Sequence, residues 1–559
     1  MRVLKERRTE CIVLLCYVIG VVCIGIFHEP WFDEGQAWQI ARSASIREIL
    51  FEVPHYEGHP PLWHLLLAIF AKNHMPYELS LHVINITFCT IAVALLVFKS
   101  PFPKIIRCAL PFTYYFFYQY GVISRPYSLM MIAIMLTAMT YKNRNEKSWS
   151  YILSLCLLCL TSAYGILISG GLCIVWVIEI LEEMLKNGTL KTFWKDRRFY
   201  SLCFILILAI LLYLMIRPAE DCYYGDVDEG VTVFTNLANL VRWLWWFFYQ
   251  FDAWFGQYFT YTTDKTDIVS IAAETLGGVI FWLILIPILK KNKRLKLFLI
   301  PHCLMTCFMV FFYFSVHHSG ILILFDVFVF WTIFEQPEGL QIPEKFKELW
   351  KKFDSEKPRK LCRGFAVFAG IVPLIYTTMA SYYEITENYG QIMPAKFIKE
   401  HHLEDKKIML AWDWKFADKQ DESSMWDTHY MPSKHPEMEK HYTYLIGHGA
   451  LLLPYFDENI FMNFNADCPE DLYMHFKYKE DTEKIFALWR QQGLPDFIVS
   501  YCPIEEVYGE EMLKDTEYLC IYEYNAGWIF KGVLTSRTYR IFIRDDLLPE
   551  YPQFERMYP

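Results

Sequence analysis

Long apolar runs fill the chain between residues 10 and 380, whereas residues 384–559 mix apolar and charged positions as a globular domain does. A helix that crosses a bilayer needs about 20 mostly apolar residues. The apolar runs therefore predict an α-helical polytopic membrane protein with about eleven spans. The predicted spans are 10–27, 79–98, 105–122, 126–141, 150–165, 166–181, 199–217, 268–289, 296–316, 319–334 and 362–380.

Lysine and arginine are distributed unevenly between the two sets of loops. With the N-terminus inside, the inner segments hold 28 of these residues and the outer segments hold 7. Basic residues collect on the cytoplasmic side of membrane proteins, so the N-terminus is predicted to be cytoplasmic. An odd number of spans then places residues 384–559 outside, in a multi-pass protein of the plasma membrane. An endoplasmic reticulum protein, with the lumen as the outer side, fits the same pattern.

The chain thus divides into a transmembrane domain, 1–383, and an extracytoplasmic soluble α/β domain, 384–559. The second domain is predicted to have helices at 391–400 and 483–492 and strands at 407–412, 496–500 and 539–543, with another apolar segment at 451–455. Its net charge is −14, against +5 for residues 1–383. An acidic domain argues against nucleic acid as a partner, and the apolar runs make the lipid bilayer the expected surroundings of the rest.

Two outer segments of the transmembrane domain are long, the first loop at 28–78 and the segment 218–267. Asp33 and Glu34 follow the first span directly and lie among aromatic residues. In one interpretation they begin a short helix, with Asp33 as its N-cap and Glu34 in its first turn. In another, a carboxylate at the membrane surface among aromatic rings acts as a general base. The two interpretations are compatible.

Further polar residues on the outer side could bind a phosphate group. His55 and His59 belong to the sequence HYEGHPPLW, and His317 and His318 lie at a span boundary. Histidines in such places also occur simply as interfacial or helix-end residues. Arg125 is almost the only cation on the outer side of the core, and an isolated cation beside a bilayer needs an anionic partner. That partner is either a phosphate or one of the two acids of the first loop.

The order of these motifs resembles that of a known superfamily. A first span followed by Asp33-Glu34, then His59-Pro-Pro-Leu-Trp63, then Ser124-Arg-Pro-Tyr127 is similar to the GT-C integral-membrane glycosyltransferases. The nearest branch is the one related to protein O-mannosyltransferases and lipid A aminoarabinose transferases. The resemblance covers about residues 10–380. It implies a polyprenyl-phosphate sugar donor used on the outer leaflet, with the acid of the first outer loop, Asp33, as catalytic base.

The residue types also suit glycosyl transfer when they are considered without the resemblance. A carboxylate base would deprotonate an acceptor that attacks the anomeric carbon, and a single base acting in line would invert the configuration. The leaving phosphate needs cations or hydrogen-bond donors. The candidate catalytic residues are Asp33 and Glu34, and the candidate donor- and phosphate-binding residues are Arg125, His59, His55, Tyr127, His317 and His318.

No cofactor is expected, and no metal ligand is assigned. A divalent cation is possible, because Glu29, Asp33 and Glu34 are close in sequence, but they are not a specific ligand set. The acceptor, whether lipid, glycan or protein, is not indicated.

Two other classes of protein remain as alternatives. A polytopic lipid or glycan transporter or flippase would place ionisable residues at mid-membrane, where the sequence offers Asp326 and little else. A non-enzymatic scaffold or receptor would leave the polar outer motifs without a purpose.

Overall fold

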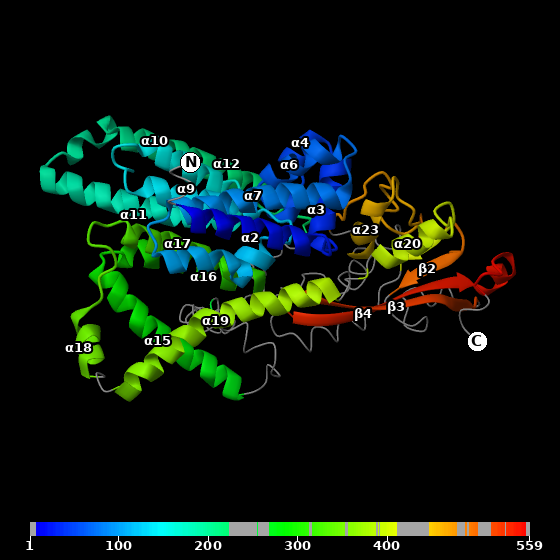
Figure 1. Ribbon diagram of the computed structural model, residues 1–559. Helices are drawn as coiled ribbons and strands as arrows, with labels where there is room; N and C mark the ends of the chain where they lie inside the picture. The colour runs from blue at the N-terminus through cyan, green and yellow to red at the C-terminus, as the bar shows by residue number, and fades with distance from the viewer. Residues whose placement is uncertain are drawn as a thin grey trace.

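The computed structural model is mostly helical, with a small sheet in the C-terminal part of the chain (Figure 1). It describes residues 7–222, 254, 268–311, 316–352, 356–386, 390, 392–410, 447–477, 487–488, 491–500, 516–530 and 533–554. Most of the outer segment 218–267 therefore lies outside the described residues, as does most of the helix expected at 483–492.

Ten of the eleven predicted apolar runs correspond to α-helices in the part of the chain that the structure describes. The helices are α2 (Arg8–Gly25), α7 (Tyr77–Lys99), α9 (Tyr127–Tyr141), α10 (Ser148–Cys159), α11 (Ala163–Asn187), α12 (Arg197–Ile216), α15 (Ile268–Lys291), α16 (Leu295–Phe311), α17 (Ser319–Phe334) and α19 (Glu356–Thr386). By length and composition, four of the described helices could cross a membrane, namely α2, α7, α11 and α12. The count of eleven spans remains a prediction.

The run at 105–122 is not one continuous helix. It consists of α8 (Lys104–Ala109), a 3₁₀ turn (Leu110–Phe112) and a π-helical turn (Tyr115–Gln119). Pro111 lies in the 3₁₀ turn, and proline has no backbone N–H to continue an α-helix. This broken run ends just before Ser124 and Arg125, so its path sets the position of the loop that carries these two residues.

The first loop folds into four short helices, α3 (Phe32–Ser43), α4 (Ile46–Phe51), α5 (Pro54–Glu57) and α6 (Leu62–Ala71). Ser45 caps α4 with a capping box, in which the Glu48 N–H donates to Ser45 Oγ at 3.2 Å. Gly58 ends α5 at a φ of +65°, a conformation that favours glycine. Helices α3 and α6 share an apolar core with α7, to which Trp38, Trp63 and Leu81 belong.

Helix α18 (Glu344–Lys352) precedes the last long helix, and the C-terminal part contains α20 (Ile392–Glu400) after it. Its four strands are β1 (Ile408–Leu410), β2 (Phe497–Ser500), β3 (Tyr518–Phe530) and β4 (Val533–Arg544), in the order β1-β2-β4-β3. β1 and β2 are parallel, and the other pairs are antiparallel. The expected helix at 391–400 and the three expected strands are confirmed.

Two features of this part go beyond the sequence expectation. β3 was not predicted, and the apolar segment 451–455 is helical, as α23 (Gly447–Leu452) followed by a 3₁₀ turn (Leu453–Tyr455). Leu453 of this segment is buried in the apolar core of the sheet. The segment is apolar because it packs there.

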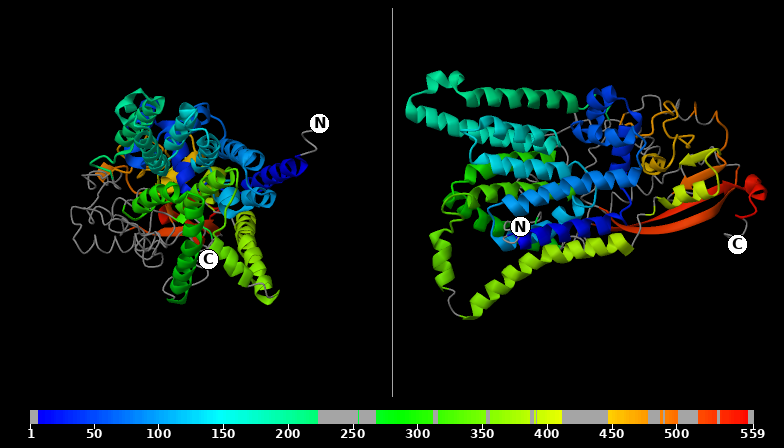
Figure 2. Two further views of the ribbon diagram at one scale, coloured as in Figure 1. Left: turned by 90° about the vertical axis from the view of Figure 1, so that its left-hand side faces the viewer. Right: turned by 45° about the horizontal axis from the view of Figure 1, so that its top comes forward.

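The first loop and the C-terminal sheet lie at the same end of the helical bundle (Figures 1 and 2). Tyr455 donates a hydrogen bond to Glu78 Oε1 at 2.9 Å, and Arg42 Nη1 donates to the Phe456 carbonyl at 2.7 Å. The two parts of the chain are thus held together by direct polar contacts.

Candidate functional site

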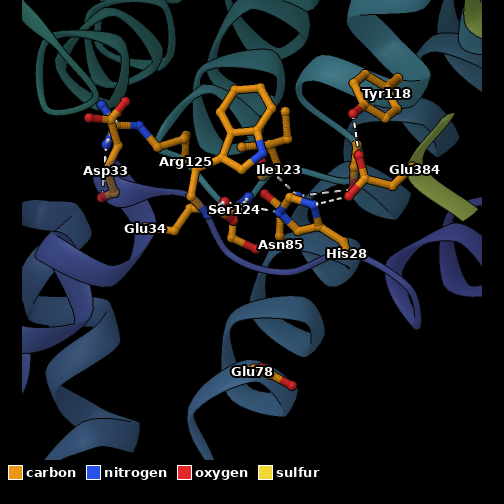
Figure 3. Close-up of polar contacts among 12 residues, drawn as sticks. His28, Asp33, Glu34, Glu78, Asn85, Tyr118, Ile123, Ser124, Arg125 and Glu384 are labelled. Carbon is orange, nitrogen blue, oxygen red and sulfur yellow. Dashed lines mark hydrogen bonds and ion pairs between the residues drawn. The ribbon is translucent and has the colours of Figure 1, made fainter. Parts of the chain in front are cut away.

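Asp33 and Arg125 meet at this end of the bundle (Figure 3). Asp33 lies in the first turn of α3, whose N-cap is Trp31 and not Asp33, and Arg125 lies two residues before α9. Arg125 Nη1 donates to the Asp33 backbone carbonyl at 3.0 Å and lies 3.7 Å from the Asp33 carboxylate. The side chain of Asp33 is 34% exposed and that of Arg125 is 15% exposed. The ion pair confirms one of the two partners expected for Arg125 and leaves the carboxylate open to solvent.

The loop that carries Arg125 is fixed from α7. Asn85, fully buried in α7, directs Nδ2 at the carbonyl oxygens of Tyr120, Gly121 and Ile123, at 3.1, 2.9 and 3.3 Å. Buried backbone carbonyls need such donors. One side chain therefore positions the segment that leads to Arg125.

Glu34, the neighbour of Asp33, is fully buried and points away from solvent. Its carboxylate accepts from the Trp31 N–H at 2.7 Å, the Ser124 N–H at 2.6 Å and His28 Nε2 at 2.9 Å (Figure 3). Burial would raise the pKa of Glu34, but the charge and hydrogen bond of His28 and the two backbone donors lower it. Glu34 thus anchors the start of α3, while Asp33 faces outward.

His28 joins the first loop to the last long helix. Its Nδ1 lies 2.7 Å from Glu384 Oε1 in α19, and Glu384 also accepts a hydrogen bond from Tyr118. Burial disfavours the imidazolium, yet the carboxylates of Glu34 and Glu384 raise the pKa of His28 to about 10. The imidazolium is hydrogen-bonded through both of its ring nitrogens. It therefore links Glu34 of the first loop with Glu384 of α19, which also contacts Tyr118.

Glu57 and His59 lie in the electrostatic field of the Asp33–Arg125 pair. Gln36 Nε2 donates to Glu57 Oε1 at 2.9 Å. Burial and the charge of Asp33 raise the pKa of Glu57 to about 7, although Gln36 and Arg125 oppose that shift. Burial and Arg125 lower the pKa of His59 to about 4. Glu57 therefore titrates near neutral pH, and His59 is a neutral imidazole there.

His64, at the start of α6, belongs to the same group. Burial, His59 and Arg125 lower its pKa to about 3. The Nδ1 atoms of His59 and His64 are both buried and have no hydrogen-bond partner among the described residues. We refer to Asp33, Glu57, His59, His64 and Arg125 as the Asp33 cluster. It combines two carboxylates, two neutral imidazoles and one guanidinium.

The other predicted site residues contact different groups. His55 Nδ1 donates to the Arg217 carbonyl at 2.6 Å, at the end of α12. Tyr127 and His317 are buried together, with Tyr127 Oη 3.2 Å from His317 Nε2. The His318 ring packs against His317, with centroids 4.2 Å apart. Tyr127 and His317 thus form a second polar contact, and Tyr127 is two residues after Arg125 in the sequence.

The three acids considered for a divalent cation engage different partners. Glu29 Oε2 accepts from the Gly390 N–H at 2.8 Å, whereas Asp33 pairs with Arg125 and Glu34 with His28. Within the described residues, no group of three or more His, Cys, Asp or Glu side chains is arranged to hold a metal ion.

Sequence reasoning missed Glu57, His64, Gln36 and the His28–Glu384 contact. Glu57 stands two residues before His59 in the motif already quoted, so the signal for it was an acid between two histidines. His28 and Glu384 are 356 residues apart, and no local pattern in one sequence indicates such a pairing.

Comparisons with protein-family models, with curated proteins and with solved structures found no match for this chain. What the site can do must therefore be judged from its chemistry. A carboxylate about one third exposed, a second carboxylate that titrates near pH 7, a guanidinium and uncharged imidazoles suit proton transfer next to an anionic group.

Proposed function

We propose that this protein is an integral-membrane glycosyltransferase that moves a sugar from a polyprenyl-phosphate donor to an extracytoplasmic acceptor. The observation that carries the proposal is the Asp33–Arg125 contact, which sets a solvent-accessible carboxylate beside a cation. The resemblance of the motifs around Asp33, His59 and Arg125 to GT-C enzymes agrees with it.

In the proposed reaction, Asp33 takes a proton from the acceptor hydroxyl or amine as that group attacks the anomeric carbon. The bond from the anomeric carbon to the phosphate oxygen breaks, and the configuration inverts. Arg125 stabilises the charge that grows on the leaving phosphate, with His59 as a neutral hydrogen-bond partner. Glu57 supplies a second carboxylate able to accept a proton at neutral pH.

Under this proposal, Glu34 has a structural and not a catalytic role, because its carboxylate is buried and bonded to three donors. His55, Tyr127, His317 and His318 bind the remainder of the donor or shape its path. The proposal includes about eleven spans, a cytoplasmic N-terminus and an extracytoplasmic C-terminal domain, in line with the unequal distribution of basic residues.

The test is release of polyprenyl phosphate by the purified full chain in lipid nanodiscs, supplied with a panel of polyprenyl-phosphate sugars and with cell-envelope extract as acceptor source. Asp33→Asn keeps the shape of the side chain and removes the base. Asp405→Asn is the matched control, since Asp405 is an exposed acid of the C-terminal part that pairs with Lys406.

Release by the wild type and by Asp405→Asn, with loss in Asp33→Asn and donor binding retained, supports the proposal. Equal release by Asp33→Asn would move the role of base to Glu57. If no donor is bound or consumed, the proposal fails and the transporter class becomes the better one. That class would then be tested at Asp326, whose Oδ2 accepts a hydrogen bond from Trp254 Nε1 at 2.7 Å in the helical part of the chain.

A further inference from the structure

Gln36 is a buried amide that bonds to both the Asp33 cluster and the C-terminal part of the chain. It lies in α3, one turn after Asp33, and is 2% exposed. Its Nε2 donates to Glu57 Oε1 and to the Met474 carbonyl oxygen, at 2.9 Å each. Its Oε1 accepts from the Met474 N–H at 2.8 Å. Both hydrogens of the amide group are used, one on each side.

The segment around Met474 lies along the first loop. Met474 and Phe476 are buried in an apolar cluster against which Phe32 and Tyr56 pack. Phe32 immediately precedes Asp33, and Tyr56 immediately precedes Glu57. The two acids of the cluster are therefore each next to a residue that contacts this segment.

Arg42 makes another polar contact between the two parts, farther along α3. Arg42 Nη1 and Nη2 donate to the carbonyls of Phe456 and Asp457, at 2.7 and 2.9 Å. These bonds hold the C-terminal part at the far end of α3, nine residues from Asp33. The Gln36 contact differs because its second N–H orients a carboxylate of the cluster.

A buried amide that loses its partners costs stability, so Gln36 favours the arrangement in which Met474 and Glu57 are both in reach. If the Met474 backbone moves away, Nε2 and Oε1 of Gln36 each lose a hydrogen-bond partner. The Gln36 amide can then rotate, and its hydrogen bond no longer holds the Glu57 carboxylate in one position. The position of the C-terminal segment is thereby coupled to the position of the Glu57 carboxylate.

We propose that the segment 472–476 is a positioning element of the Asp33 cluster, which holds Glu57 in place through Gln36. The role of Glu57 in catalysis rests on the proposed glycosyl transfer, whereas the coupling itself is a property of the fold. An acceptor that binds the C-terminal domain and displaces Met474 would then act on the Glu57 carboxylate through Gln36.

Several charged or titratable groups face Glu57 from the elements around it. They are Asp33 on α3, Arg125 before α9, and Tyr473 of the C-terminal segment. Asp33 disfavours ionisation of Glu57, and Gln36 and Arg125 favour it. Removing Gln36 therefore leaves a Glu57 that ionises at higher pH, provided that the other groups stay where they are.

The experiment measures the titration of Glu57 without relying on turnover. Dicyclohexylcarbodiimide modifies protonated carboxyl groups in apolar surroundings, and mass spectrometry gives the labelled fraction of the peptide that contains Glu57 at each pH. Wild type, Gln36→Met, Gln36→Asn and Arg42→Met are compared as full chains in nanodiscs. Gln36→Asn is the milder variant, one methylene too short to bond to both partners, and Arg42→Met is the matched control.

The expected result is a labelling midpoint near pH 7 in the wild type and in Arg42→Met. We expect an upward shift of about half to one pH unit in both Gln36 variants, the size of one lost hydrogen bond. An unchanged midpoint in folded Gln36→Asn overturns the proposal. An equal shift in Arg42→Met also overturns it, because any loosening of the C-terminal part would then suffice.

Polyprenyl-phosphate release is measured on the same samples so that the two proposals fail separately. A shifted midpoint in the Gln36 variants with no release by any protein supports the coupling and counts against the glycosyltransferase. Both the glycosyl transfer and the coupling are supported by a different result. In it, the wild type releases polyprenyl phosphate, and the acid limb of the pH–rate profile shifts to higher pH in Gln36→Met but not in Arg42→Met.

Discussion

Arg125 bonds to the backbone of Asp33 more closely than to its carboxylate, at 3.0 Å to the carbonyl oxygen and 3.7 Å to Oδ2. The guanidinium therefore fixes the start of α3 and still leaves the Asp33 carboxylate accessible. Such an arrangement lets one cation hold the Asp33 backbone in place and face an anionic group at the same time.

We expect Arg125→Met to lower the turnover number by about 10²- to 10³-fold, the typical effect of losing one group that stabilises a developing anion. Arg125→Lys should recover part of the rate, because it keeps the charge but not the planar set of donors. Turnover is measured as polyprenyl phosphate released. Arg47→Met, which removes an exposed cation of the same loop, should behave as the wild type.

Glu34→Gln should destabilise the protein without abolishing the chemistry. The variant leaves the buried His28 with one carboxylate fewer, and breaking a buried ion pair costs about 3 kcal/mol or more. A drop in the thermal midpoint in detergent is the expected readout, together with near-normal turnover per folded molecule. Turnover lost as completely as in Asp33→Asn, at an unchanged midpoint, would instead assign Glu34 to catalysis.

The charge chain at His28 predicts weaker stability at alkaline pH. The pKa of His28 rises from 6.5 to about 10 on folding, so between these values the folded chain holds a proton that the unfolded chain lacks. Stability is then full below pH 6.5 and falls as pH rises toward 10, by up to about 1.4 kcal/mol per pH unit. Thermal midpoints recorded from pH 6 to about pH 10 test this.

In the same series, His28→Gln should be less stable and should lose most of the alkaline slope. His74→Asn is the control, since His74 is exposed and asparagine tolerates its φ of 55°. An alkaline slope that persists in His28→Gln would show that other groups control it.

Asn85→Ala should displace the Arg125 loop from a distance. The substitution leaves the carbonyls of Tyr120, Gly121 and Ile123 without a buried donor, at a cost of about 1–3 kcal/mol. We expect a lower thermal midpoint and a lower turnover number, because Arg125 follows this loop. Thr87→Val, on the exposed side of the same helix, should change neither. Normal turnover in Asn85→Ala would argue that Arg125 is positioned by other contacts.

The apolar pattern was a good guide to helices and a poor guide to their interruptions. Helices α7 and α9 begin within two residues of the predicted spans, since a long run of apolar residues favours a helix in nearly any context. The predicted span at 105–122 instead breaks near Pro111, which was visible in the sequence but whose effect depends on neighbouring helices. In the C-terminal part, β3 was missed because its mixed residues take their strand conformation from pairing with β4.

By itself, the sequence determined the apolar runs that form the described helices before residue 384, the acidic α/β part after them, and Asp33, His59 and Arg125 as candidates. Those features depend on local composition, or on motifs a few residues long. Only the tertiary structure decided that Asp33 faces outward while Glu34 is buried against His28, and that Glu57 joins the cluster through Gln36. Adjacent residues on a helix point in different directions, and contacts over hundreds of residues follow from packing that no local pattern encodes.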